Sequence, residues 1–199
     1  MSDFKKIGIY GGTFDPIHHG HLILSEWAIV KLHLDLVYFV PASVHAFKKE
    51  SELSPSEIRY NMIAAAIKNF PRLRVSRIEI DRPSTSYTID TLKNINANES
   101  INRTELIYLI GSDNLREFHL WKNPDKILEL AQVCVLKRPG YNENTINNKY
   151  KDKVNILDSP LISISATEIR KRVRENKPYK SLIPEEVYEI IEQNKLYRN

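Results

Sequence analysis

Short runs of strand-forming residues alternate with helix-forming segments along almost the whole chain, and this alternation restricts the fold more than any other feature. Continuous apolar runs such as LVYFV at 36–40 are typical of strands that are buried on both faces of a sheet. Strand followed by helix, repeated in this way, predicts an α/β fold with a doubly wound parallel sheet and right-handed crossovers.

Strands are expected at residues 6–10, 36–40, 73–80, 106–110, 132–136 and 154–157. Helices are expected at about 20–33, after a cap at Ser54 with Pro55 as first helical residue, over 88–95 and 124–130, and from about Ser165 and Pro184. The polar stretch 142–151 is expected to be mobile. One domain is expected over residues 1–199, with a helical C-terminal portion over about 164–199.

Ligands bind beyond the carboxyl ends of the strands in sheets of this kind. Chemistry is therefore expected directly after Tyr10, Val40, Ile80, Ile110 and Leu157. Polar or glycine-containing segments follow most of these positions, so the candidate site lies along one edge of the sheet.

The composition excludes several other classes of protein. The single cysteine, Cys134, cannot form an internal disulfide, and no Cys/His spacing matches a zinc site, so no metal ligands from the protein are expected. No apolar run approaches the roughly 18 residues of a membrane span, and the first six residues are too short and polar for a signal peptide. A cytoplasmic protein without a membrane partner is expected.

The charge is concentrated in one part of the chain. Residues 137–180 carry 11 Lys and Arg against 5 Asp and Glu, although the whole chain has a net charge of only +4. So small a total gives little support to nucleic-acid binding, whereas its concentration favours a small polyanion as ligand. The sequence is compatible with a monomer or a homo-oligomer.

The string GGTFDPIHHGH directly follows the first expected strand. The paired glycines, Gly11 and Gly12, let backbone N–H groups approach a phosphate, and a helix that begins near Gly20 directs its positive end there. His18 and His21 are three residues apart, so both rings can face one ligand across the helix start. The spacing matches neither the dinucleotide fingerprint nor the P-loop.

A second candidate phosphate site follows the last expected strand. Ser165-x-x-Glu168 is a capping box, which predicts a helix start. The cap alone does not explain the three arginines in the next turns. Helix-start amides, the hydroxyls of Ser165 and Thr167, and the Arg170 guanidinium would together hold a polyphosphate.

Two further segments contain groups suited to a nucleotide. PSTSYTIDTL reads as a polar loop that enters a helix, with Asp90 in its first turn. In IGSDNL, Gly111 permits close approach of a ribose or base and Asp113 can accept hydrogen bonds from sugar hydroxyls. Trp121 offers a stacking face for an aromatic ring, although packing is an equally common role for a tryptophan.

These motifs resemble those of a known superfamily. H-x-G-H after a glycine turn and I-S-x-T-x-x-R, here at 164–170, resemble the nucleotidyltransferases. GGTFDPIHHGH, SYTIDTL, IGSDNL and the WK that follows are similar to the bacterial nicotinate-nucleotide adenylyltransferases in particular. Smaller matches at RYNMIAA, KRPGY and the C-terminus extend this resemblance over essentially the whole chain.

The resemblance implies a Rossmann-like nucleotidyltransferase fold with C-terminal helices. It also implies transfer of the adenylyl group of ATP to nicotinate mononucleotide in NAD biosynthesis, with release of pyrophosphate and with Mg²⁺ bound together with ATP. No nucleic acid is implied as a partner.

The same resemblance assigns the site residues. Those implied in catalysis are His18, His21 and Arg170. Those implied in ATP binding are Gly11, Gly12, Thr13, Phe14, His18, His21, Gly111, Asp113, Ile164, Ser165, Thr167 and Arg170. Those implied in nicotinate mononucleotide binding are Lys48, Tyr87, Thr88 and Trp121, with the backbone at Thr88 meeting the pyridine carboxylate.

The sequence departs from the family after the second expected strand, where P-P-H-K or P-P-H-R is usual. Here VHAFK occupies 44–48: Lys48 keeps the basic position, but Phe47 stands where the histidine is usual. The role of this loop, and of His45 within it, is left open.

Three alternative functions are weighed against this one. Phosphopantetheine adenylyltransferases share H-x-G-H, but S-Y-T-x-D-T-L argues against them. A cytidylyltransferase would need a different C-terminal motif, although residues 164–170 alone do not forbid it. A non-catalytic RNA- or nucleotide-binding module would leave both histidines idle, and a net charge of +4 without interleaved exposed aromatic residues gives it little support.

Overall fold

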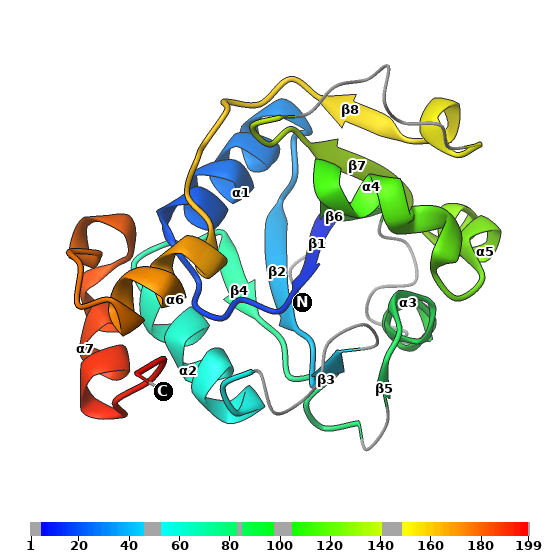
Figure 1. Cartoon of the computed structure of the whole chain (residues 1–199). Coiled ribbons are helices and arrows are strands. Elements are labelled where there is room, and N and C mark those ends of the chain that lie inside the picture. The colour runs from blue at the N-terminus through cyan, green and yellow to red at the C-terminus, as the bar shows by residue number, and fades with distance from the viewer. Residues whose placement is uncertain (1–4, 46–52, 83–84, 98–104, 141–148, 199) are drawn as a thin grey trace.

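The computed structural model describes residues 5–45, 53–82, 85–97, 105–140 and 149–198. Six parallel strands form one sheet in the order β4-β2-β1-β6-β7-β8 (Figure 1). The strands are β1 (Lys6–Gly12), β2 (Leu36–Pro41), β4 (Leu73–Val75), β6 (Glu105–Gly111), β7 (Gln132–Leu136) and β8 (Asn155–Leu157). This order confirms the predicted doubly wound fold.

Helices cover both faces of the sheet (Figure 1). On one face lie α1 (His19–Lys31), α2 (Ser56–Ile67), α6 (Ala166–Arg174) and α7 (Glu185–Gln193). On the other lie α3 (Thr88–Asn96), α4 (Ser112–Glu117) and α5 (Pro124–Leu130). Single 3₁₀ turns at Phe118–Leu120, Lys151–Lys153 and Lys180–Leu182 join some of these elements.

Each face of the sheet has its own apolar core. Along β1, Ile7 and Ile9 belong to the core under α3, α4 and α5, whereas Tyr10 belongs to the core under α1, α2, α6 and α7. Along β2, Val37 and Phe39 belong to the same core as Tyr10. Because successive side chains of a strand point to opposite faces, burial on both sides explains the continuous apolar runs in the sequence.

The prediction of one strand over 73–80 is wrong, because β4 ends at Val75. Its last ladder contact is the Ser76 N–H, which donates to the Phe39 carbonyl at 2.9 Å. The chain then leaves the sheet edge, although the alternation of apolar and polar residues continues beyond this point.

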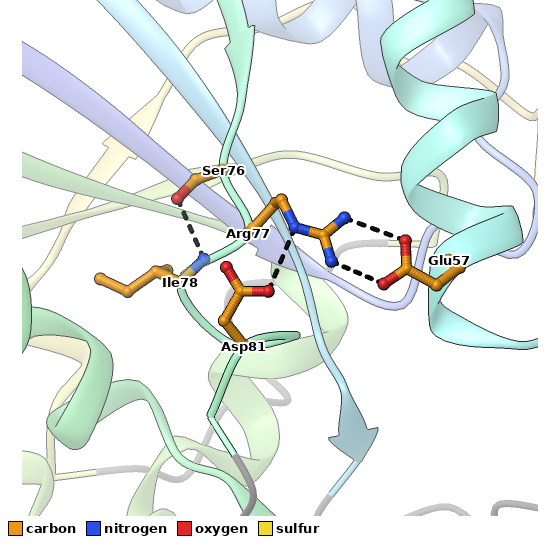
Figure 2. Close-up of polar contacts among 5 residues, drawn as sticks. All are labelled: Glu57, Ser76, Arg77, Ile78 and Asp81. Carbon is orange, nitrogen blue, oxygen red and sulfur yellow. Dashed lines mark hydrogen bonds and ion pairs between the residues drawn. The ribbon is translucent and has the colours of Figure 1, made fainter.

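A cluster of polar contacts fixes the turn that replaces the end of that strand (Figure 2). The Arg77 guanidinium donates two hydrogen bonds to Glu57 of α2, at 2.9 and 2.6 Å, and one to Asp81 at 3.1 Å. The Ile78 N–H donates to Ser76 Oγ at 3.3 Å. The bonds to Glu57 join this turn to α2, and the other contacts lie within the turn.

The start of α2 also differs from the prediction. Pro55 occupies the cap position and the helix begins at Ser56, so Ser54 does not cap it. Instead the Ser54 N–H donates to Asp15 Oδ2 at 3.0 Å. The starts of α1, α3, α5, α6 and α7 agree with the predicted positions within a residue or two.

Three short elements were not predicted from the sequence: the helix α4, which follows β6 directly, and the strands β3 and β5. A second, two-stranded parallel sheet joins β3 (Val44–His45) and β5 (Thr85–Ser86), which are too short to leave a pattern. Residues 141–148, most of the stretch expected to be mobile, lie outside the described residues. Tyr150 in the same stretch is buried and donates its hydroxyl hydrogen to Asp125 of α5 at 2.9 Å.

Candidate active site

The crossover direction reverses at β1, which pairs with β2 on one side and with β6 on the other. Ligands of open α/β sheets bind at such a point, outside the carboxyl ends of the strands. A cavity of about 440 Å³ lies there, and we call it the histidine cavity. All the residues expected to bind ATP line it except Ile164, whose side chain packs against the apolar core instead.

His18 and His21 stack on each other in this cavity, with ring centroids 3.7 Å apart and planes inclined by 23°. The His18 backbone N–H, at the cap of α1, donates to His21 Nδ1 at 3.3 Å. Because that nitrogen accepts, a neutral His21 carries its proton on Nε2. Among the described residues, His18 Nδ1 is buried without a hydrogen-bond partner.

Both histidines are neutral at physiological pH. Burial, helped by Arg138 and His19, lowers the pKa of His18 to about 3. Burial, His18 and Arg138 lower the pKa of His21 well below its ordinary value. A neutral imidazole still has one N–H to donate, so these rings can bind phosphate oxygens as hydrogen-bond donors.

Three distant parts of the chain fix the turn between β1 and α1. The buried Asp15 carboxylate accepts hydrogen bonds from the Ser54 N–H at 3.0 Å and from the Tyr197 hydroxyl at 2.5 Å. Arg59 of α2 is fully buried and donates to the Thr13 carbonyl at 2.9 Å and to two further carbonyls. Asp15 therefore braces the turn.

The start of α6 faces the same turn. Ser165 Oγ accepts from the Glu168 N–H at 3.2 Å, which confirms the predicted cap. Arg170 donates to the Asp15 carbonyl at 2.7 Å and to the Thr167 hydroxyl at 3.4 Å. The two motifs at opposite ends of the sequence thus meet at one cavity.

An ion pair at the end of β6 escaped the sequence analysis. Arg138 Nε lies 3.6 Å from Asp113 Oδ1, and both residues line the histidine cavity. A Cβ at Gly111 would lie 2.3 Å from that oxygen and 2.9 Å from Arg138 Nε, so any side chain there would displace the pair. Arg138 follows β7, and a search of the segment after that strand would have found it.

A second cavity of about 120 Å³ adjoins the first and shares Gly11 and Gly12 with it. We call it the tryptophan cavity. It is lined by three of the four residues expected to bind nicotinate mononucleotide, namely Tyr87, Thr88 and Trp121. The fourth, Lys48, lies outside the described residues together with Phe47.

Trp121 both packs and lines the tryptophan cavity. Its ring centroid lies 5.2 Å from that of Phe118 and 6.2 Å from that of Tyr108. The Tyr108 hydroxyl lies 3.1 Å from Thr88 Oγ1, and a Cβ at Gly11 would lie 2.2 Å from the same hydroxyl oxygen. Tyr108 was missed because, within a strand, it reads only as core.

The described residues hold no group of three or more His, Cys, Asp and Glu that could bind a metal ion. No helix in the described part of the chain is long and apolar enough to cross a membrane.

Comparison with known proteins identifies the family. Residues 9–172 match the family described as Cytidylyltransferase-like. Two relatives named "Probable nicotinate-nucleotide adenylyltransferase" are similar over nearly their whole length. That of Acidothermus cellulolyticus is 37% identical over 97% of this chain and 94% of its own, and that of Clostridium beijerinckii is 39% identical over 98% and 100%.

A solved structure supports the fold. The Plasmodium falciparum nicotinic acid mononucleotide adenylyltransferase, complexed with NaAD, superposes with a TM-score of 0.80 over 97% of both chains, at 22% sequence identity. The structural likeness shows the fold, and the sequence matches show the family. The chain belongs to the nicotinate-nucleotide adenylyltransferases, within the cytidylyltransferase-like family.

Proposed function

We propose that the protein transfers the adenylyl group of ATP to nicotinate mononucleotide, giving nicotinate adenine dinucleotide and pyrophosphate in NAD biosynthesis. One observation carries this function. A cavity with two stacked neutral histidines, Arg138 and Arg170 meets a cavity with Trp121 at the end of β1. Two nucleotides bound in these cavities would meet at their phosphates.

The reaction is an in-line attack of the mononucleotide phosphate oxygen on the α-phosphorus of ATP, with pyrophosphate as the leaving group. The attacking phosphate is already an anion at neutral pH, so the protein supplies no nucleophile. Catalysis then depends on positioning and on stabilising charge in the transition state. His18 and His21 donate to the phosphate oxygens on which this charge grows.

The N-terminus of α6 holds the leaving group. Its first backbone amides, the Ser165 and Thr167 hydroxyls and the Arg170 guanidinium surround one part of the histidine cavity. These groups bind the β- and γ-phosphates, because a helix N-terminus and a guanidinium both favour anions. Arg170 is also tied to the Asp15 carbonyl, which aligns it with the turn that holds the rest of ATP.

Mg²⁺ enters with ATP as part of the substrate. The carboxylates that line the histidine cavity, Asp15, Asp113 and Glu117, do not form a metal-binding group among the described residues. Asp15 is already occupied by Ser54 and Tyr197. Such a cavity fits an ion held mainly by phosphate oxygens and water, which neutralises part of the triphosphate charge.

Selection of nicotinate over nicotinamide rests on the start of α3. Tyr87 is the cap of this helix and Thr88 is its first residue, and both line the tryptophan cavity. The backbone N–H groups of a helix start donate to an anion, so a ring carboxylate is favoured over a neutral amide there.

The first experiment measures pyrophosphate release with ATP and Mg²⁺, using nicotinate mononucleotide, nicotinamide mononucleotide and phosphopantetheine as acceptors. Strong release with the nicotinate form alone is expected. Release with another acceptor would retain the phosphate chemistry and contradict the roles of Thr88 and Trp121. ATP binding without release for any acceptor would favour a non-catalytic nucleotide-binding module.

The single domain, the cytoplasmic location and the oligomeric state stay predictions.

A further inference from the structure

One buried carboxylate in the tryptophan cavity has no role in the reaction described above. Glu79 lies in the turn after β4, which the pair of Arg77 with Glu57 ties to α2 (Figure 2). The Glu79 side chain is only 6% exposed, and what remains open faces the cavity that Trp121 also lines. The turn therefore directs an acidic group into the expected ring site.

The hydrogen-bond partners of Glu79 are hydroxyl groups. Thr91 Oγ1 donates to Oε1 at 2.5 Å, and the Ser86 hydroxyl also hydrogen-bonds to the carboxylate. Within the described ranges, no Lys, Arg or His forms an ion pair with it at 4.0 Å or less. Arg82 and Arg59 attract it from farther away, yet burial raises the pKa of Glu79 above its ordinary value.

A carboxylate in such surroundings is expensive to keep ionised. Burial of a charge without an ion-pair partner costs several kcal/mol, and hydroxyl donors offset only part of this cost. A cation in the cavity would offset more of it. Pyridine mononucleotides bring such a cation, because the ring nitrogen that bonds to the ribose makes the ring a pyridinium.

We propose that the Glu79 carboxylate recognises the positive charge of the pyridinium ring and so selects the oxidised mononucleotide over its uncharged dihydro form. This inference rests on the proposed function, since it takes the tryptophan cavity as the ring site. The nicotinate ring carries a negative carboxylate and a positive ring nitrogen, and each charge then has its own partner in the cavity. The start of α3 receives the ring carboxylate, and Glu79 faces the ring cation.

The aromatic residues of the cavity support the same ligand. Trp121 and Tyr108 line it together with Glu79. The face of an aromatic ring attracts a cation, and this attraction grows when water is excluded. A flat cationic ring therefore gains from the aromatic side chains and from the carboxylate, whereas a neutral dihydropyridine loses both contributions.

The test compares nicotinate mononucleotide with its 1,4-dihydro form, which keeps the carboxylate, ribose and phosphate but lacks the ring charge. Binding of each is measured by calorimetry at pH 8 on the full chain, alongside pyrophosphate release from ATP and the oxidised form. We expect the wild-type protein to bind the oxidised form about tenfold more tightly or better, as a charge pair at partly buried separation allows. In Glu79→Gln this ratio should fall to about threefold or less.

Two further variants separate charge from shape. Asp81→Asn removes a carboxylate from the same turn, but that side chain is 62% exposed and pairs with Arg77, so the ratio should stay at the wild-type value (Figure 2). Thr91→Val removes one hydroxyl donor from Glu79 but leaves the carboxyl group in place, so it should retain more of the ratio than Glu79→Gln does.

The outcomes distinguish this inference from the proposed function. Suppose that the wild type turns over nicotinate mononucleotide normally, but that the ratio of affinities for the oxidised and dihydro forms is the same in the wild type and in Glu79→Gln. This result overturns the role of Glu79 and leaves the proposed function intact. A wild-type ratio near one overturns it without any variant, which covers the case that Glu79→Gln does not fold. Absence of turnover in the wild type contradicts the proposed function and this inference together.

Discussion

His18 and His21 are neutral imidazoles, and this determines what each can do in the proposed reaction. A neutral ring cannot neutralise phosphate charge, but it can donate one well-directed hydrogen bond in a site that excludes water. Substitution His18→Ala should therefore lower kcat by on the order of a hundredfold or more, as loss of one transition-state donor does. Steady-state pyrophosphate release measures it.

The neighbouring His19 provides a matched control for that substitution. It is the first residue of α1 and half exposed, and it does not line the histidine cavity. His19→Ala should keep most of the activity. Near-normal turnover in His18→Ala would remove His18 from the catalytic residues.

Trp121 should affect one substrate far more than the other. It lines the tryptophan cavity and not the histidine cavity, so Trp121→Ala should weaken nicotinate mononucleotide binding much more than ATP binding. Separate titrations with each ligand measure this difference. Trp27→Ala is the control, because Trp27 lies on α1 and donates its ring N–H to the Asp158 carbonyl. Equal losses for both ligands in Trp121→Ala would contradict the stacking role.

Sequence reasoning placed residues at the histidine cavity where a motif marked them. His18, His21, Ser165 and Arg170 were found because each stands in a short string after a strand. Glu79 and Tyr108 were not, because a single acidic or aromatic residue in an apolar run has no local signal. Only the packing of distant elements makes these two line a cavity.

Among the elements, the segment after α7 reaches the histidine cavity through one hydrogen bond. The Tyr197 hydroxyl donates to Asp15, and Tyr197→Phe leaves that buried carboxylate short of one donor. The free energy of unfolding should fall by about 1–3 kcal/mol, and the KM for ATP should rise severalfold because the turn after β1 loosens. Urea unfolding and ATP kinetics measure the two effects.

Tyr179→Phe is the matched control for this element. It removes a similar hydroxyl-to-carboxylate hydrogen bond, from Tyr179 to Glu192 at 2.6 Å, away from the histidine cavity. This variant should lose stability without a change in the KM for ATP. If both variants change the KM equally, the Tyr197 contact has no special connection to the ATP site.

Element boundaries were predictable where local signals and tertiary contacts agree. Ser165 caps α6 as its sequence indicates, because no other element competes for its hydroxyl among the described contacts. The strand expected at 73–80 ends at Val75, and the turn that follows pairs Arg77 with Glu57, 20 residues away along the chain. Ser54 does not cap α2 because Pro55 takes the cap position, and the Ser54 side chain hydrogen-bonds to Tyr197 instead. In both cases the competing partner is distant in sequence.

For the whole molecule, the buried histidines make stability depend on pH. The folded-state pKa of His18 is about 3, against about 6.5 in the unfolded chain. Between these values the unfolded chain binds a proton that the folded protein does not, so stability falls as the pH drops below about 6.5. The slope is about 1.4 kcal/mol per pH unit for each such histidine.

Urea unfolding of the wild type and of His18→Asn at pH 7 and pH 5 tests this dependence. Asparagine is a favoured helix cap and does not titrate, so α1 should still form. Other groups titrate alike in both proteins, and the wild type should lose more stability on acidification than the variant. If both proteins lose the same free energy of unfolding between pH 7 and pH 5, the folded protein protonates His18 as readily as the unfolded chain does.

The hydrogen bond between Tyr197 and Asp15 also bears on when during synthesis the protein can bind ATP. β1 and its turn leave the ribosome early, whereas the hydroxyl that completes the turn is made 182 residues later. A nascent chain that has paired all six strands, the last of which ends at Leu157, still lacks α6, α7 and Tyr197. A chain released at that stage lacks the α6 residues that line the histidine cavity, so it should bind little nucleotide.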